Sequence, residues 1–495
     1  MALQLFNTLS GKIEEFQPAE DNTVRFYACG PTVYDYGHIG NFRTFVAVDL
    51  LRRYLRQSGF KTRHVMNITD VDDKIIRNAS QRGMSIFDYT KKYTQAFLDD
   101  MQTLAIEQPE MIVKATDHID EMAQFIEDLA AKDVAYRTEE GSYYFRIAKF
   151  PQYGKLSKKD FAGMTDGARV DVDEYDKDNA RDFALWKAPK EGEFSWETKI
   201  GAGRPGWHIE CSTMSMKYLG ETFDLHAGGE DLIFPHHENE VAQSEAHTGK
   251  TFARFWMHAR FLLVEGQKMS KSLGNFYTLR DLVLMGHKPS SIRFLLSSVP
   301  YRKQLNFTFD GLTQAATSVE RLRNFKLRLE TSAWPEGKNA QLSQLTATIR
   351  EEMRAAMDDD LNTARMLGAI FDLVRDANGM ADGGNLQKEN VPELLGALGQ
   401  FDGIFDVMND NDAAKVKTVV EWAQAEGKAD KISEATLDIA KSAALSDAQV
   451  EELVAKHSEA RKNRDFKTSD AIRNQLAEEG ILLENTKDGV RWKRK

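Results

Sequence analysis

Hydrophobic positions near the start of the chain change from the period of a strand to that of a helix and back again. Residues 24–29 (VRFYAC) form a short apolar run typical of a strand, and residues 61–69 (KTRHVMNIT) form a second one. Between them, apolar side chains recur at intervals of three and four, on one face of an amphipathic helix; they are Phe45, Val48, Leu51 and Leu55. A strand, a helix and a strand in this order build parallel sheets, so we predict an α/β core.

The pattern changes again along the rest of the chain. Residues 120–205 alternate short strand-like runs with loops rich in Gly, Lys and Asp, which predicts an insertion into the core. Strand-like runs return at 223–225 and 255–263. Residues 309–405 are rich in Leu, Ala, Arg and Glu and helical in period, which predicts a helical bundle. The polar stretch 409–447 is interpreted as a linker with some helix.

A small unit is predicted at the end of the chain, over residues 446–495, with a helical pattern followed by two strand-like runs. From Lys456 to Lys495 there are eleven Lys and Arg against seven Asp and Glu, whereas the whole chain has a formal net charge of −11. Phosphates respond to local charge, so this tail predicts a nucleic-acid contact, although charge runs are commonly only solvated faces. The candidate contacts are Arg461, Lys462, Arg464, Lys467, Arg491, Trp492, Lys493 and Arg494.

Composition limits the class of protein. A length of 495 residues suggests roughly three domains, and 42% hydrophobic residues are enough for several packed cores. The longest apolar runs, such as 261–264, are far shorter than the roughly 20 residues that cross a bilayer, so we expect no membrane contact. Residues 1–12 lack the pattern of a secretory signal, and we therefore expect a cytoplasmic location.

Two loops have residue types suited to binding phosphates. Gly37, His38, Ile39, Gly40 and Asn41 stand between a predicted strand and the start of a predicted helix. Glycines allow a close backbone approach there, the helix N-terminus offers free N–H groups, and an imidazole can donate to a phosphate. By itself such a loop is more often an ordinary turn.

The second loop is Lys268-Met269-Ser270-Lys271-Ser272. Its two lysines, three positions apart, can neutralise a departing pyrophosphate. The alternative for this loop alone is a solvated basic turn.

A third set of residues has the chemistry of a metal site. His236 and Glu240 are four positions apart on a predicted helix and share one face, a spacing that favours His236 over His237. Together with Cys29 and Cys211, the only cysteines of the chain, they make a sensible zinc ligand set if the fold brings them together. Otherwise each cysteine is a small buried hydrophobic residue.

The two loops, about 230 residues apart, resemble the HIGH and KMSKS signatures of class I aminoacyl-tRNA synthetases. Further segments resemble the cysteinyl-tRNA synthetase family; they are 26–35 (FYACGPTVYD), 67–74 (NITDVDDK), 206–212 (GWHIECS) and 234–240 (FPHHENE). The resemblance is strong over residues 5–310 and looser beyond. One position departs from the signature, because Asn41 stands where HIGH has its second histidine.

The resemblance implies roles for these residues. Zinc, one ion per subunit, would be held by Cys29, Cys211, His236 and Glu240. The substrate cysteine would contact Gly30, Thr32, Trp207 and His226. ATP would bind at Gly37, His38, Gly40 and Lys271, and catalysis would fall to His38, Asn41, Lys268 and Lys271.

It also implies the fold and the reaction. We expect an α/β fold with a Rossmann-like parallel-sheet catalytic core, an insertion, a helical bundle and a small mixed C-terminal unit. The expected divisions are 1–119 and 206–265 for the two core halves, 120–205 for the insertion, 266–308 for the KMSKS loop and stem-contact region, 309–405 for the bundle, and 446–495 for anticodon recognition. The expected enzyme is a monomer that joins cysteine to tRNA(Cys), with ATP and Mg²⁺.

Two other functions remain open at this point. A ligase with the same core that joins activated cysteine to an amino sugar would lack the C-terminal RNA-binding region, whereas nearly 190 residues follow the core here. A non-catalytic zinc-binding or tRNA-binding paralogue would have no need for the lysine pair of Lys268 and Lys271.

Overall fold

The computed structural model describes residues 2–159, 182–445, 447–486 and 489–494. Its centre is a five-stranded sheet in the order β12-β11-β3-β4-β5, in which every neighbouring pair is parallel. The strands are β3 (Thr23–Ala28), β4 (Lys61–Ile68), β5 (Met111–Lys114), β11 (Phe223–Gly229) and β12 (Ala253–Ala259). The predicted strand, helix, strand unit is confirmed, with α1 (Ile39–Gln57) as the crossover helix.

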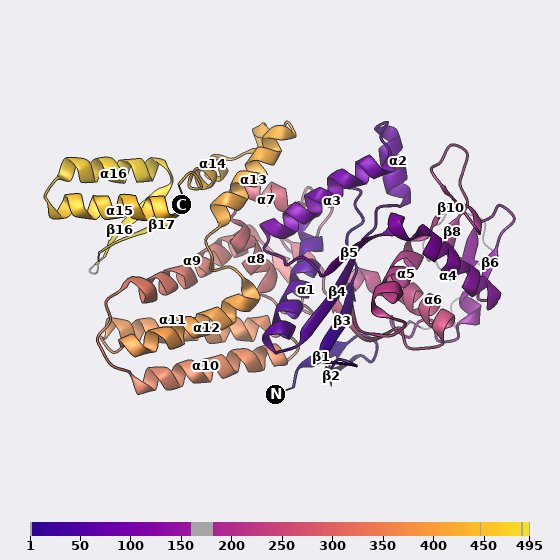
Figure 1. The fold of residues 1–495 in the computed structure, drawn as a ribbon, viewed down its shortest axis with the longest axis horizontal. Helices are drawn as coiled ribbons and strands as arrows, with labels where there is room; N and C mark the ends of the chain where they lie inside the picture. The colour runs from indigo at the N-terminus through magenta and orange to yellow at the C-terminus, as the bar shows by residue number, and fades with distance from the viewer. Residues whose placement is uncertain (1, 160–181, 446, 487–488, 495) are drawn as a thin grey trace.

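The two faces of this sheet are covered by different helices (Figure 1). Phe26 packs in the core cluster that includes α1, whereas its neighbour Tyr27 packs in the cluster that includes α4 (Ile119–Ala131) and α5 (Trp207–Leu219). Alternate side chains of a strand point to opposite faces, and a parallel sheet with both faces covered favours continuous apolar strands. β11 accordingly is buried at every position.

The strand order places a topological switch between β3 and β11. From β3 the chain builds outward through β4 and β5, and later from β11 outward through β12. Crevices for ligands form at the carboxyl ends of parallel strands where the order reverses in this way.

A separate antiparallel sheet occupies the segment predicted as an insertion, in the order β6-β7-β8-β10-β9. Its strands are β6 (Ala135–Arg137), β7 (Tyr143–Phe145), β8 (Phe183–Lys187), β9 (Trp196–Thr198) and β10 (Gly201–Pro205). The description of this segment as strands and loops was incomplete, because α4 begins it and buries Met122, Phe125 and Ile126 at helical spacing. Residues 160–181 of the segment lie outside the described residues.

The strand predicted at 255–263 was wrong in extent. β12 ends at Ala259, and β13 (Leu262–Val264) belongs to another sheet, β14-β13-β15, with β14 (Gln267–Lys268) and β15 (Leu305–Phe307). Between them the backbone N–H of Arg260 donates to the carbonyl of Tyr301, so the chain leaves the central sheet here. An apolar run cannot reveal such a change of pairing partner.

Helices make up the following part of the chain. The bundle predicted over 309–405 consists of α9 (Phe309–Thr331), α10 (Ala340–Asp358), α11 (Thr363–Asp382) and α12 (Val391–Phe405). The stretch interpreted as a linker with some helix contains α13 (Asp412–Ala425) and α14 (Glu434–Lys441), so its helical part is confirmed. These pack on α7 (Leu279–Leu284) and α8 (Pro289–Ser297), where Ser290 donates to Asp412 and Thr436 donates to the carbonyl of Leu284.

The C-terminal unit has α15 (Asp447–Lys462), α16 (Phe466–Glu478) and a hairpin of β16 (Ile481–Thr486) and β17 (Gly489–Arg494). Val450, Leu476 and Ile481 form its own small core. It lies at the opposite end of the elongated molecule from the antiparallel sheet (Figure 1). The remaining strands and α-helices of the described residues are β1 (Gln4–Asn7), β2 (Lys12–Glu15), α2 (Asp73–Gln81), α3 (Ile86–Thr103) and α6 (Glu238–Thr248).

None of the helices in the described ranges combines the length and apolarity needed to cross a membrane.

Candidate active site

Two clusters of polar side chains lie at the switch between β3 and β11. Cys29 directly follows β3, and His226 stands on β11. Around them gather side chains from α5 and from α6 (Glu238–Thr248), although these elements are far apart in the sequence. The carboxyl ends of parallel strands meet at one edge of the sheet, which is why these positions converge.

The first cluster has the donor set and spacing of a tetrahedral metal site. The ligand atoms of Cys29, Cys211, His236 and Glu240 all lie within 4.8 Å of one another and all four residues are buried. The Cys29 Sγ atom is 3.8 Å from Cys211 Sγ and 3.7 Å from His236 Nε2. Four tetrahedral ligands about 2.0 to 2.3 Å from a zinc ion would stand about 3.3 to 3.8 Å apart, so the distances from Cys29 fit the ion. The sulfur distance is too long for a disulfide, whose sulfurs are about 2.05 Å apart.

The acidities of the four groups are uneven: burial raises the pKa of the Cys29 thiol well above its usual range, and, although burial opposes it, Glu240 raises the pKa of His236 to about 10. Burial works against the thiolate of Cys211, but the hydrogen bond with Cys29 and the neighbouring His236 outweigh it and lower its pKa to about 6. Burial likewise opposes ionisation of Glu240, but His226 and His236 lower the pKa of its carboxyl to about 2. A buried carboxylate beside two sulfurs needs positive charge nearby, which a metal ion supplies.

A second group of donors overlaps the first and consists of Cys29, His226, His237 and Glu240. His237 Nε2 is 3.2 Å from Cys29 Sγ, closer than His236 is. The spacing argument had favoured His236 alone, but it assumed one regular helix. The backbone is kinked at Phe234, which has extended φ and ψ, and both histidines that follow the kink reach the cluster. The two sulfurs at the edge length of a tetrahedron favour the set that contains Cys211 and His236.

Histidines that the sequence reasoning left out surround the cluster. His208 Nδ1 lies 3.0 Å from His236 Nδ1, and His237 Nδ1 lies 2.8 Å from His258 Nε2. Burial lowers the pKa of His208 and of His258, the latter to about 3, so both are neutral. His258 was detectable in principle, since it stands near the carboxyl end of β12, beside Gly228 of β11.

The residues expected to contact substrate cysteine border the same cluster. Trp207, at the start of α5, is 38% exposed and stacks on His236 with 4.1 Å between ring centroids. His226 Nε2 is 2.8 Å from Glu240 Oε2. Gly30 donates its N–H to Asn67 Oδ1, and a β-carbon at Gly30 would stand 1.7 Å from the Asn67 carbonyl oxygen. Thr32 pairs in backbone register with Thr69 of the adjacent strand end.

The first phosphate-type loop forms the start of α1. His38 is its N-cap, and its Nδ1 accepts from the Asn41 backbone N–H at 3.1 Å while Asn41 Oδ1 accepts from the His38 N–H at 3.1 Å. With Nδ1 an acceptor, the ring proton sits on Nε2. Burial, with a contribution from Lys271, lowers the pKa of His38 to about 4, so the ring is a neutral donor at neutral pH.

The second loop lies against this helix start. Ile39 donates to the Tyr277 carbonyl and His38 pairs in backbone register with Thr278. A β-carbon at Gly40 would stand 2.9 Å from the His38 ring and 3.2 Å from Met269 Cε, so glycine permits this close approach. Gly37 is likewise restricted, by the ring of Phe42 at 2.9 Å. The two motifs, remote in sequence, therefore share one side of the crevice.

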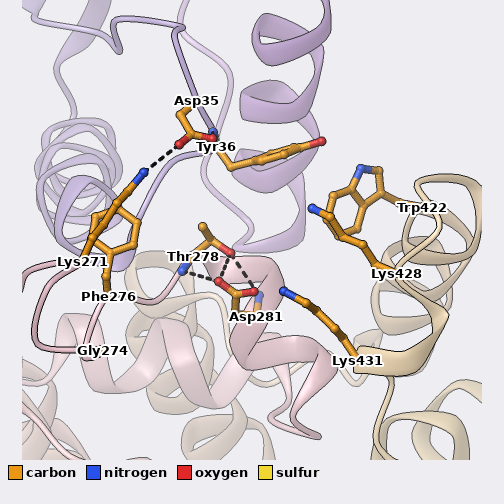
Figure 2. Close-up of a pocket in the computed structure, with 10 residues that line it drawn as sticks. All are labelled: Asp35, Tyr36, Lys271, Gly274, Phe276, Thr278, Asp281, Trp422, Lys428 and Lys431. Carbon is orange, nitrogen blue, oxygen red and sulfur yellow. Dashed lines mark hydrogen bonds and ion pairs between the residues drawn. The ribbon is translucent and has the colours of Figure 1, made fainter.

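Lys271 and Lys268 differ in their surroundings. Lys271 Nζ is 3.0 Å from Asp35 Oδ2 and lies over the ring of Phe276. Lys268 is exposed on β14. Asn275 shapes the loop, since it accepts from the Ser270 N–H and donates to the Lys268 carbonyl. Figure 2 shows Lys271 at the wall of a cavity of about 310 Å³.

Comparison with known proteins identifies the family to which this chain is similar. Residues 15–317 match the family described as tRNA synthetases class I (C) catalytic domain, and residues 352–408 match the DALR domain. A cysteine–tRNA ligase of Koribacter versatilis is 70% identical over 100% of both chains. A second, from Solibacter usitatus, is 57% identical, again over 100% of both chains.

Solved structures support the fold alone, because their sequence identity is low. A Mycobacterium tuberculosis methionyl-tRNA synthetase in complex with methionyl-adenylate has a TM-score of 0.57 at 14% identity, covering 84% of this chain and 93% of its own. An Agrobacterium radiobacter K84 leucyl-tRNA synthetase in a ternary complex has a TM-score of 0.58 at 11% identity, covering 80% and 86%.

Proposed function

Because the chain belongs to the cysteine–tRNA ligase family of class I tRNA synthetases, we propose how its residues carry out that reaction. The enzyme activates cysteine with ATP and transfers it to tRNA. In the first step the cysteine carboxylate attacks the α-phosphate, a new O–P bond forms, and pyrophosphate leaves. In the second step the terminal ribose hydroxyl of tRNA(Cys) attacks the activated carbonyl and AMP leaves. Mg²⁺ accompanies ATP in this scheme.

Cys29, Cys211, His236 and Glu240 hold one zinc ion per subunit in this proposal, supported by the sulfur spacing and by the lowered pKa of Cys211. When bound there, zinc offers the soft thiolate of a substrate cysteine a ligand bond that a hydroxyl does not match. His208 holds the ring of His236 through its Nδ1 atom and fixes the direction of Nε2.

The substrate cysteine lies between Trp207, His226 and the backbone of Gly30 and Thr32. The support is position, because Trp207 stacks on His236 and His226 bonds to Glu240, so both border the metal ligands. The tight packing of Gly30 against Asn67 leaves no space for a side chain that would fill this region.

The phosphates of ATP lie along Gly37, His38, Gly40 and Lys271. His38 donates from Nε2 as a neutral group, and Lys268 and Lys271 supply the charge that stabilises departing pyrophosphate. Asn41 acts as a positioning residue, because its side chain bonds to the His38 backbone and its backbone bonds to the His38 ring. The missing second histidine of the signature is thus compensated by a helix cap.

One observation supports this function most strongly. The four metal-type donors converge, and the HIGH loop contacts the segment after KMSKS through the backbone of His38 and Thr278. Purified protein should catalyse cysteine-dependent ATP–pyrophosphate exchange without tRNA, and should charge tRNA(Cys). Transfer of cysteine to an amino sugar instead of tRNA, or exchange that does not depend on cysteine, would overturn it. Absence of both activities would indicate a non-catalytic paralogue.

We further propose that residues 446–495 recognise the anticodon, supported by their basic charge and their place at the end of the molecule. We also propose the domain boundaries expected from the sequence, which are 1–119, 120–205, 206–265, 266–308 and 309–405. We propose that the enzyme works as a monomer in the cytoplasm, where charged tRNA is used. Light scattering across a concentration series tests the oligomeric state.

A further inference from the structure

The cavity beside the KMSKS loop has a second wall that the reaction scheme leaves without a role. Asp35, Tyr36, Lys271 and the residues after it form one side (Figure 2). The other side is formed by Trp422 at the end of α13 and by Lys428 and Lys431 in the connection to α14. This second wall lies outside both matched segments, 15–317 and 352–408.

The cavity lining carries a net charge of +1, because it has three lysines, Lys271, Lys428 and Lys431, and two carboxylates, Asp35 and Asp281. Lys271 pairs with Asp35, and Asp281 is occupied as a cap that accepts from the Thr278 N–H and hydroxyl. Beyond the lining, Arg280 pairs with Asp100, and Glu426 with Lys92. Within the described part of the chain, neither Lys428 nor Lys431 has a carboxylate partner. The cavity therefore presents uncompensated positive charge to whatever enters it.

Contacts among Lys428, Trp422 and Tyr36 connect this wall to the loop that precedes α1. Lys428 Nζ lies 4.6 Å from the Trp422 ring centre and 4.9 Å from that of Tyr36. Tyr36 and Trp422 meet edge to face at 5.3 Å, and Tyr36 stands two residues before His38. Lys428 is thereby held in place before any ligand arrives, which reduces the entropy cost of binding an anion. Lys431, exposed beside it, adds a second donor.

The position of the wall points to RNA as the ligand. α13 and α14 lie between the central sheet and the C-terminal unit (Figure 1). A tRNA whose end enters the crevice at the switch, and whose other arm reaches the C-terminal unit, passes this connection. We propose that Lys428 and Lys431 bind the sugar–phosphate backbone of tRNA at this cavity. The inference rests on the proposed function and extends it to residues with no role there.

A phosphate could also come from ATP, since Lys271 borders the same cavity, so the experiment separates the two sources. The variant Lys428→Gln/Lys431→Gln is compared with wild type in pyrophosphate exchange without tRNA and in tRNA charging. We expect unchanged KM for ATP and cysteine in exchange, and a KM for tRNA raised about tenfold. The slope of log KM for tRNA against log salt should fall by about 1 to 2, as expected for one or two lost phosphate contacts.

Matched variants keep this test decisive. Lys250→Gln/Lys388→Gln removes the same charge from exposed lysines elsewhere, which pair with Glu221 and Glu336, and should leave the KM for tRNA near wild type. Lys428→Arg/Lys431→Arg should restore charging. If the double variant folds poorly, Lys431→Gln alone, outside the contacts among Lys428, Trp422 and Tyr36, should still raise the KM for tRNA.

An unchanged KM for tRNA in folded variants would overturn the proposal. A raised KM for ATP in exchange without tRNA would overturn it too, and would assign the site to the triphosphate. Failure of the proposed function is a different result, because the wild-type protein itself would then not charge tRNA.

Discussion

His38 and Asn41 show how a signature can change one residue and keep its geometry. The Asn41 amide oxygen accepts the His38 N–H, and the His38 ring accepts the Asn41 N–H, so the two residues close a capping box at the start of α1. The same bonds place the ring proton on Nε2, the nitrogen left for a ligand. We therefore propose that Asn41 acts by holding His38 in place as a neutral donor.

Asn41→Ala should slow cysteine activation more than it changes substrate affinity, because His38 loses its orientation. Loss of the cap should also lower the free energy of unfolding by about 1 kcal/mol. Pyrophosphate exchange and chemical denaturation measure the two effects. Asn41→Asp retains the acceptor oxygen and should keep most of both properties; equal damage by the two substitutions would contradict the capping role.

Lys271→Ala should reduce the rate of pyrophosphate exchange by about 10²- to 10³-fold and leave the KM for cysteine near wild type, because the charge acts chiefly as pyrophosphate departs. Steady-state exchange kinetics provide the measurement. Lys288→Ala, on the connection before α8, is a control outside the loop. An unchanged exchange rate would remove Lys271 from the chemistry.

At the scale of elements, α13 and α14 extend the part of the chain that packs on the catalytic core beyond the helical bundle. The polar sequence of this stretch indicated a linker with some helix, and the structure shows that Ser433 and Thr436 bond to backbone groups of α7, the helix that follows the KMSKS loop. The C-terminal unit, in contrast, has its own small core. The helices that pack on α7 and the unit proposed to bind RNA thus follow each other closely in sequence.

A chain that ends after Ala444 should activate cysteine at near the wild-type rate but charge tRNA poorly, since it loses only the basic unit. A chain that ends after Phe405 should lose both activities, because it also lacks the helices packed on α7 and α8. Exchange, charging and thermal unfolding of the two truncations give the comparison. Full tRNA charging by the chain that ends after Ala444 would rule out an RNA role for residues 446–495.

At the scale of the whole molecule, the candidate metal site of Cys29, Cys211, His236 and Glu240 exists only when β3, α5, residues 233–237 and α6 assemble. Cys29 and Cys211 are 182 positions apart in the sequence and 3.8 Å apart at their sulfurs. The buried site thus depends on the fold, and metal binding should in turn stabilise it.

His236→Gln should lower the zinc content and raise the KM for cysteine, while the KM for ATP changes little. Elemental analysis of the purified protein measures the first, and exchange kinetics the others. His247→Gln, at a partly buried histidine that pairs with Asp128 away from the cluster, is the control and should bind one zinc per chain. Active wild-type protein without zinc would contradict the assignment.

Serine should be rejected at activation without any later hydrolysis. A site built around one specific bond rejects an analogue that lacks it by roughly 10⁴-fold, and a zinc–thiolate bond is of this kind. Seryl-tRNA(Cys) mixed with the enzyme should therefore decay at its spontaneous rate. Rapid enzyme-dependent clearance would reveal an additional hydrolytic site.

The sequence by itself determined the class of fold, the HIGH and KMSKS loops and the candidate ligands, because local periodicity and residue chemistry act over a few positions. Strand 24–29, the helix at 45–55 and strand 61–69 follow from such patterns, and the structure confirms them. The family resemblance, carried by four short segments, also needed no structure and agrees with the comparisons.

Only the tertiary structure decided which distant residues meet. It brought His208, His237 and His258 around the cluster, moved residues 262–264 to a second sheet, and turned residues 412–441 from linker into support for α7. It also placed Lys428 and Lys431 beside the KMSKS loop. The physical reason is the same in each case: strand pairing and helix docking join segments that are from about twenty to more than a hundred residues apart in the sequence, and no local pattern records the partner.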